Sequence, residues 1–322
     1  MNVLITGISG MVGSHLAEYI LKNHPSAAVH GLVRWRSPLD NIRHILPQIS
    51  LHQADLKDLN SLIILMRRIR PSRIFHLAAQ SYVTFSFDVP ADTIQNNVIG
   101  TVNLLDAVRL TEIDPMIHIC SSSEVYGQVS EDEIPIKESN PFRPASPYAV
   151  SKVGEDMIAY QYFLSYGIKT IRTRMFTHTG PRRGDVFAES SFARQIAEIE
   201  AGLRSNPVKV GNLDSIRTIA DVRDAVKAYW LLLENCEPGE VYNIGGQETM
   251  TVGNILEILK NLARGPIEHE VDAQLMRPSD VTLQIPDISK FQNDTGWQPK
   301  IKVIQTLGDL LEYHRIRTRN EI

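Results

Sequence analysis

The chain of 322 residues has few of the features that mark secreted, membrane-bound or polyanion-binding proteins. It has two cysteines, Cys120 and Cys236, which lack the spacing of a metal site or of a disulfide framework. No apolar run reaches the length of a membrane span, and the net charge of -4 argues against a nucleic-acid partner. The apolar start, MNVLITGISG, has no basic leader and predicts a strand. We therefore expect a cytoplasmic protein with neither a membrane nor a nucleic-acid partner.

Apolar, β-rich runs alternate with helical patterns through the first half of the chain. The strand-like runs are NVLITG, AAVHGLV, ISLHQADL, RIFHLAA and MIHICSS, with helical runs such as MVGSHLAEYILKN between them. This alternation predicts an α/β fold with a Rossmann-type, doubly wound parallel sheet and helices on both of its faces. Later helical patterns break the alternation and predict a smaller, mostly helical substrate-binding lobe. We assign residues 1–172 and 214–246 to the Rossmann domain, and 173–213 and 247–322 to the second domain.

A glycine-rich turn follows the first predicted strand. Gly7, Gly10 and Gly13 permit a tight turn, close approach of the backbone to a pyrophosphate and close packing of helix on strand. Met11 and Val12 stand at the start of the following helix, whose N-terminus favours an anion. The pattern with its flanking strand and helix predicts a dinucleotide-binding loop, and a glycine turn without a ligand is the alternative.

The second predicted strand ends in Val33-Arg34-Trp35-Arg36-Ser37, where an NAD enzyme would present an acidic residue to the ribose. Guanidinium groups attract a 2'-phosphate, which an acid would repel. Arg34 and Arg36 therefore predict NADP as the cofactor. The alternative is that both arginines are solvated surface charges.

Two further motifs are expected to meet at the carboxyl edge of the sheet. Tyr148 and Lys152 lie one helical turn apart, so their side chains share a helix face. A nearby ammonium lowers the pKa of a tyrosine, which lets the phenolate accept a hydroxyl proton while hydride leaves to a nicotinamide. Ser122 and Glu124 follow the strand MIHIC within SSSEVYG. The alternatives are that the serines cap a helix and that Glu124 caps a helix or pairs with an arginine.

Together, the segments TGISGMVG, HLAAQS, NNVIGT, SSSEVYG and YAVSK resemble the extended short-chain dehydrogenase/reductase family over nearly the whole chain. The resemblance implies a nucleotide-sugar epimerase, dehydratase or reductase. It implies that Ser122 hydrogen-bonds the sugar, that Tyr148 is the base and that Lys152 binds the nicotinamide ribose. It also implies further contacts: Asp55 and Leu56 with adenine, Leu77 and Ala79 with the cofactor, and Ser81 with the substrate.

Within that family, VHGLVRWRSPLDNIRHI, AAQSYVTFSFDVP, NPFRPASPYAVSK and GPRRGDVF are similar to segments of GDP-mannose 4,6-dehydratases. Such an enzyme oxidises C4, removes the C5 proton and expels the C6 hydroxyl, and Glu124 matches its catalytic glutamate. The second half, with SSFARQIAEIE, is equally similar to reductases that convert GDP-4-keto-6-deoxymannose into GDP-rhamnose, which can also carry a Ser-Ser-Glu loop. The intact segment 181–184, PRRG, favours the dehydratase.

The chain departs from the dehydratase pattern at three places. Ser122 stands in place of a threonine, Thr177 in place of the asparagine before His178, and Ser190-Ser191 in place of a basic pair. The last two changes alter contacts to the sugar or the diphosphate. The resemblance further implies a set of substrate contacts: Thr177 and His178 with the sugar, Arg183, Arg217 and Arg277 with the diphosphate, and Asp280 with the nucleoside ribose. Each arginine alone is more often a surface charge, and His178 is as well explained as a structural histidine.

We predict that the chain dehydrates GDP-mannose to GDP-4-keto-6-deoxymannose, with NADP recycled and no metal. One rival is net reduction of the keto sugar, in which NADPH is consumed, and another is a binding protein that keeps the fold without turnover. The helices after NNVIGT and YAVSK imply, through the resemblance, a helical interface in a homodimer or homotetramer. The sugar and the base stay open at this point, because both are taken from the resemblance.

Overall fold

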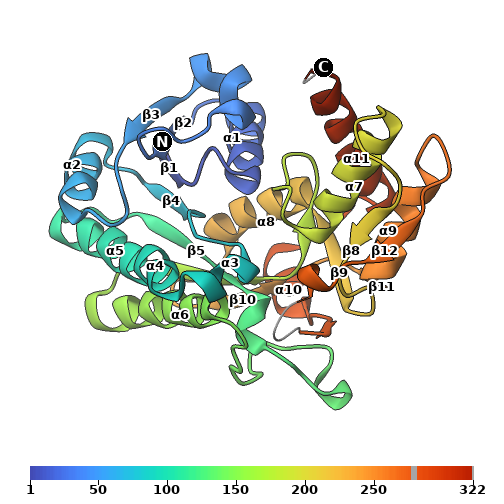
Figure 1. The fold of residues 1–322 in the computed structure, drawn as a ribbon. Helices are drawn as coiled ribbons and strands as arrows, with labels where there is room; N and C mark the ends of the chain where they lie inside the picture. The colour runs from blue at the N-terminus through green and yellow to red at the C-terminus, as the bar shows by residue number, and fades with distance from the viewer. Residues whose placement is uncertain (277–280, 321–322) are drawn as a thin grey trace.

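The computed structural model describes residues 1–276 and 281–320, and its largest element is a seven-stranded parallel sheet (Figure 1). The order of strands reverses between β1 and β4, and ligands bind at such a switch point in open α/β sheets. The predicted Rossmann-type sheet is confirmed. Across the sheet the strands are β3 (Ser50–Gln53), β2 (Ala28–Val33), β1 (Asn2–Thr6), β4 (Arg73–His76), β5 (Met116–Ser122), β6 (Thr170–Met175) and β10 (Val241–Ile244).

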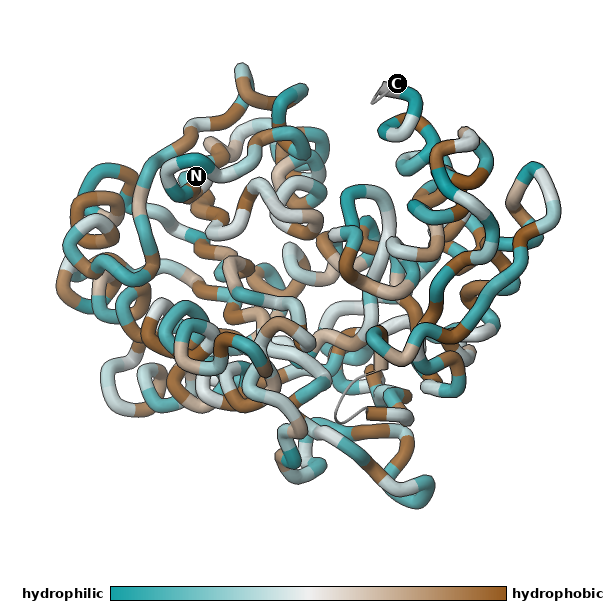
Figure 2. Tube along the Cα trace, viewed as in Figure 1, coloured by the Kyte–Doolittle hydropathy of each residue, from teal (hydrophilic) through white to brown (hydrophobic). Residues whose placement is uncertain are grey.

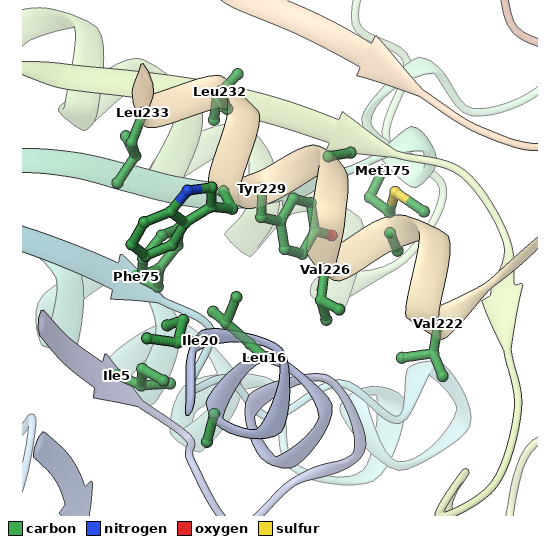
Figure 3. Close-up of a cluster of buried hydrophobic side chains, with 14 of the residues drawn as sticks. Ile5, Leu16, Ile20, Phe75, Met175, Val222, Val226, Tyr229, Leu232 and Leu233 are labelled. Atoms are coloured by element: carbon green, nitrogen blue, oxygen red, sulfur yellow. The ribbon is translucent and has the colours of Figure 1, made fainter. Parts of the chain in front are cut away.

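Helices cover both faces of this sheet, as a parallel sheet requires. On one face, α1 (Met11–Asn23) packs beside α8 (Val222–Asn235). Figure 3 shows side chains of these two helices, Leu16 and Val226 among them, pointing toward each other and toward Phe75 of β4. The other face carries α2 (Leu59–Ile69), α5 (Gly100–Leu110) and α6 (Pro147–Tyr166), which enclose a second apolar cluster.

A π-helical turn interrupts the helical segment that lies between β4 and β5 in the sequence. After α3 (Val83–Asp88), the chain forms α4 (Pro90–Ile94), continues through π-helical residues Gln95–Ile99 and passes into α5. Such turns are often found at functional sites. Here the π turn carries the NNV part of the NNVIGT segment, and it lies against α6.

The second lobe is smaller and lies on the right of Figure 1. It is built from α7 (Ala188–Glu200), α9 (Val252–Asn261) and α11 (Val303–Asn320), whose apolar faces pack together with the β-strand pair β8 (Val208–Val210) and β12 (His269–Val271). In Figure 2 the traces of these helices alternate between teal and brown, as expected for helices with one buried face. The mostly helical character predicted for this lobe is therefore found, with short strands added.

A small sheet joins the two lobes. Its central strand, β9 (Ile216–Asp221), pairs with β11 (Glu248–Thr251), β13 (Leu283–Gln284) and β7 (His178–Thr179). The helix α10 (Ser289–Thr295) returns to the first lobe and packs on α8 and β10, although the predicted domain bounds place this segment in the second domain. No helix within 1–276 and 281–320 is long and apolar enough to cross a membrane.

Buried ion pairs hold α6 against the sheet. Asp156 of α6 is fully buried, and it accepts hydrogen bonds of 2.9 Å from both Arg172 and Arg174 of β6. Arg174 also donates to the hydroxyl of Tyr126 at 3.0 Å and to the carbonyl of Glu138 at 2.7 Å. These groups are stable inside the protein because each charge is paired and hydrogen-bonded.

We expect Asp156→Asn to lower the free energy of unfolding by about 3–5 kcal/mol, because it leaves two buried guanidinium groups without a carboxylate. The measurement is denaturant unfolding followed by circular dichroism. Asp40→Asn is the matched control, because the pair of Asp40 with Arg43 is more than 70% exposed, at 73% and 76%. Equal losses for the two variants would contradict the structural importance of the buried pair.

Candidate active site

A cavity of about 940 Å³ lies between the carboxyl edge of the parallel sheet and the second lobe. Its lining includes every predicted site residue within the described ranges except Arg36: Gly7, Gly10, Met11, Val12, Gly13, Arg34, Asp55, Leu56, Leu77, Ala79, Ser81, Ser122, Glu124, Tyr148, Lys152, Thr177, His178, Arg183 and Arg217. Arg277 and Asp280 lie outside the described residues. The strand ends of the sheet thus gather motifs that are far apart in the sequence.

The glycine loop forms a close-packed cradle between β1 and α1. Gly7 has a φ of +72°, which favours glycine, and a Cβ at position 13 would lie 2.3 Å from the Gly7 carbonyl oxygen. The described first turn of α1 has no acidic residue, and Gly10 at its N-cap makes no side-chain cap hydrogen bond. The N–H groups of this helix end are therefore suited to an anion.

The two arginines after β2 have different surroundings. Arg34 lines the cavity, and its backbone N–H donates to the hydroxyl of Ser37 at 3.0 Å. Arg36 has a φ of +69°, does not line the cavity, and stacks its guanidinium over the exposed Trp35 ring, 4.3 Å from the centroid. The two arginines of the motif therefore have different roles available to them, because Arg34 lines the cavity and Arg36 contacts Trp35.

Tyr148 and Lys152 project from the first turns of α6. Ser146 caps this helix by accepting from Ala149 N–H at 3.0 Å, and Pro147 occupies its first position. The Lys152 ammonium lies 5.8 Å from the centroid of the Tyr148 ring and donates to the carbonyl of Cys120 at 3.0 Å. The predicted shared face of the helix is present, and both side chains are buried.

Two opposing influences act on the acidity of Tyr148. Burial raises the pKa of Tyr148, while the charge of Lys152 and the hydroxyl of Ser122 act in the opposite direction. The predicted influence of the ammonium on Tyr148 is therefore present, and burial is the larger effect, so the pKa lies above its usual value. Burial is the largest single influence on the pKa of Lys152 and lowers it, but Glu155, Tyr148 and Cys120 together raise the pKa above its usual value, so the ammonium stays charged.

Ser122 and Glu124 lie on one short turn at the end of β5. The Ser122 hydroxyl accepts from the N–H of Glu124 at 3.2 Å, so it caps the 3₁₀ turn Ser123–Tyr126. The capping role that was kept as an alternative is therefore present. Both side chains also line the cavity beside Tyr148, so capping and exposure to a ligand occur together.

The second lobe presents charged and polar groups from β7, β9 and the start of α7. Arg183 forms an ion pair with Glu189, with 3.1 Å between Nε and Oε1, and its guanidinium lies 3.5 Å from the centroid of the Phe187 ring. His178 Nδ1 lies 3.1 Å from the carbonyl oxygen of Phe176, and burial together with Arg183 lowers the pKa of His178 to about 4. His178 is therefore neutral near pH 7. Arg217 lines the same wall.

Several residues that shape the cavity were missed by sequence reasoning. Asn97 of the π turn bonds both Gln80 and Ser151: its Oδ1 accepts from Gln80 N–H at 2.8 Å, and its Nδ2 donates to the Ser151 hydroxyl at 2.9 Å. The family resemblance of the NNVIGT segment pointed to this region of the chain, but it did not identify the hydrogen-bond partners of Asn97. Asn41 lines the cavity and donates to the carbonyl of Ser9. The two residues are 32 positions apart in the sequence, so no local pattern predicts this contact.

Arg182 and Glu18 form another contact that the sequence did not reveal. Arg182 donates to Glu18 of α1 at 2.6 Å and to the hydroxyl of Ser14 at 3.2 Å, so the loop after β7 is fastened to the helix that follows the glycine loop. Within the described residues, no three His, Cys, Asp or Glu side chains gather in the manner of a metal site.

Comparisons with known proteins agree on one family. A family model described as GDP-mannose 4,6 dehydratase matches residues 4–310. GDP-6-deoxy-D-mannose reductase of Pseudomonas aeruginosa is 34% identical, over 99% of both chains. GDP-mannose 4,6-dehydratase of Yersinia enterocolitica is 33% identical, over 96% of this chain and 92% of that protein. The structure of RMD from Pseudomonas aeruginosa complexed with NADPH has a TM-score of 0.86 at 33% identity and covers 98% of this chain and 99% of that one.

Proposed function

Because the chain belongs to the GDP-mannose 4,6-dehydratase family, we propose that it removes water from GDP-mannose to give GDP-4-keto-6-deoxymannose. The observation that carries this proposal is the placement of Glu124 on the same turn as Ser122, in the cavity that Tyr148 and Lys152 also line. Hydride transfer alone needs no carboxylate at that position, whereas removal of a carbon-bound proton needs a general base, a role that a carboxylate can fill.

NADP fits the residues at the sheet edge. The glycine cradle and the open N-terminus of α1 suit a pyrophosphate, and Arg34 supplies a positive charge beside the end of β2. When bound there, NADP would supply the hydride acceptor for oxidation of the sugar and the hydride donor for the later reduction. Asp55, Leu56, Leu77 and Ala79 then border the cofactor in this proposal, and Lys152 holds its nicotinamide ribose.

The chain's own groups handle the protons. Tyr148 takes the proton of the C4 hydroxyl, Ser122 donates a hydrogen bond to the same oxygen, and the Lys152 ammonium stabilises the phenolate. Glu124 removes the proton from C5, which the neighbouring ketone has made acidic, and protonates the hydroxyl that leaves C6 as water. To complete the product, C6 would take back the hydride given up at C4, and C5 would receive a proton that replaces the one Tyr148 removed from the C4 hydroxyl. The atoms then balance, with GDP-mannose giving the keto sugar and water.

The substrate lies toward the second lobe. Arg183 and Arg217, with Arg277 outside the described residues, are assigned to the diphosphate because planar guanidinium groups match phosphate oxygens. Ser81, Thr177 and neutral His178 border the sugar, and Asp280 is assigned to the nucleoside ribose. The ion pair of Arg183 with Glu189 orients the guanidinium before a ligand arrives.

The test is to incubate the purified chain with GDP-mannose and catalytic NADP while following product mass and the absorbance of the reduced cofactor. We expect loss of one water without accumulation of NADPH. Tyr148→Phe and Glu124→Gln should each lower kcat by about 10²–10⁴-fold, because each removes a proton-transferring group. Unchanged circular dichroism would show that both variants fold. Full turnover by Tyr148→Phe would exclude this mechanism.

A second candidate is reduction of GDP-4-keto-6-deoxymannose, with NADPH consumed. It is favoured by the 34% identity to the Pseudomonas reductase, which matches this chain over 99% of both lengths. The same assay separates the two reactions, because the reductase leaves GDP-mannose intact and oxidises one NADPH per keto sugar. In that outcome Glu124→Gln retains activity while Tyr148→Phe does not.

The two arginines after β2 allow a sharp test of the cofactor. We expect Arg34→Ala to weaken NADP binding by about 10–100-fold and to leave NAD binding nearly unchanged, because it removes a charge-assisted contact to the 2'-phosphate. Arg36→Ala is the matched control, because Arg36 lies outside the cavity lining. The measurement is fluorescence titration with each cofactor. Equal effects of Arg34→Ala on both cofactors would contradict the assignment.

We further propose that the chain works in the cytoplasm as a homodimer, or as a homotetramer of such dimers, joined through α5 and α6. Met157, Tyr160 and Leu164 are exposed on one face of α6. Leu164→Arg should convert the assembly to monomers in sedimentation velocity, because it buries a charge in an apolar contact. Leu203→Arg, at an exposed leucine in the turn after α7, should leave the assembly unchanged. A monomeric wild-type chain would contradict this proposal.

A further inference from the structure

A buried carboxylate lies directly behind the candidate catalytic lysine. Glu155 follows Lys152 by three positions on α6, and its Oε2 lies 3.0 Å from the Lys152 ammonium. The side chains are 6% and 1% exposed for Lys152 and Glu155, respectively. The second oxygen of Glu155, Oε1, is buried and has no hydrogen-bond partner among the described residues. A buried carboxylate oxygen without a hydrogen-bond partner costs free energy, which suggests that the charge of Glu155 has a function.

The other ionisable groups near Lys152 are either paired elsewhere or uncharged. Asp156, the next residue on α6, is occupied by the ion pairs with β6. His76 of β4 and His118 of β5 are uncharged near pH 7, because burial, followed by neighbouring positive groups, lowers the pKa of each to about 3. Glu155 is thus the carboxylate that the described part of the chain places in contact with the ammonium.

Two further ionisable groups beside Tyr148, on β5 and α8, are uncharged near pH 7. Burial raises the pKa of Cys120 on β5 and of Tyr229 on α8, so both keep their protons near pH 7. Their Sγ and hydroxyl oxygen lie 3.4 Å apart. Among the described residues, the charged groups that shift the pKa of Tyr148 are the Lys152 ammonium and the Glu155 carboxylate, which have opposite signs.

We propose that Glu155 is a positioning residue that fixes the Lys152 ammonium and partly cancels its charge at Tyr148, so that Tyr148 holds its proton more tightly than it would beside the lysine alone. This inference rests on the proposed roles of Tyr148 and Lys152. Beyond burial, which is the largest effect, Lys152 lowers the pKa of Tyr148 and Glu155 raises it. The lysine alone would make the tyrosine a stronger acid than it is with the carboxylate present.

Glu155 also titrates in a useful range. Burial raises its pKa to about 7, although Lys152 acts in the opposite direction. The carboxylate is present above that pH and is protonated below it. The offset at Tyr148 therefore operates mainly above pH 7.

The test is the pH profile of kcat/KM, which reports groups of the free enzyme. We expect Glu155→Gln to move the inflection that belongs to Tyr148 to lower pH by roughly one unit, because a nearby negative charge is lost. If Tyr148 acts as a base, the rate below the inflection rises about tenfold relative to the maximum. If it acts as an acid, the alkaline loss of rate begins about one unit earlier.

Two further variants make the result decisive. Glu155→Asp keeps the charge and should restore the wild-type inflection even if the maximal rate falls. Glu155→Met is uncharged and of similar volume, so it replaces Glu155→Gln if that variant does not fold. Should both uncharged variants be inactive, ultraviolet titration of tyrosinate, taken as the difference from the same chain with Tyr148→Phe, measures the shift directly.

A profile of unchanged shape in Glu155→Gln, with or without a lower rate, would overturn the inference and leave Glu155 with a structural role. The proposed function is tested separately. If Tyr148→Phe retains full turnover in an otherwise wild-type chain, the catalytic assignment fails, whatever the behaviour of the Glu155 variants.

Discussion

The position of α6 against the parallel sheet is the constraint on which the candidate site depends. Asp156 pairs with Arg172 and Arg174 of β6, and these bonds set the depth and rotation of the helix. Tyr148 and Lys152 lie two turns and one turn before Asp156, so the same bonds determine where their side chains enter the cavity. A helix free to rotate by one position would direct both groups elsewhere.

The same network reaches the opposite wall of the site. Arg174 donates to the hydroxyl of Tyr126, which in turn donates to Asn243 at 2.7 Å. Tyr126 ends the turn that carries Ser122 and Glu124. Buried hydrogen-bonded groups of this kind favour a single geometry, because displacement of Arg174 or Tyr126 leaves polar atoms unpaired in a medium of low dielectric constant. Base, carboxylate and ammonium are thereby fixed relative to one another.

A second set of contacts sets the width of the cavity. Arg182 of the loop after β7 is bonded to Glu18 and Ser14 of α1, and the ring of His15 lies 3.1 Å from the carbonyl oxygen of Pro181. These bonds connect the segment that presents Arg183 with the helix whose N-terminus faces the cofactor position. This contact therefore determines the distance between the dinucleotide side and the sugar side of the cavity. Close packing matters equally for Glu155, because its charge acts strongly on Lys152 and Tyr148 only when water is excluded.

The sequence by itself determined the parallel sheet, the glycine loop and the Tyr148–Lys152 face, because periodicity, glycine spacing and one-turn separation are local properties that survive in any packing. It also placed Ser122 and Glu124 at a strand end. Only the tertiary structure separated Arg34 from Arg36, made burial the larger influence on Tyr148, and placed Glu155 against Lys152 without solvent. These outcomes depend on desolvation and on contacts between distant segments, and the chain encodes both only through the complete fold.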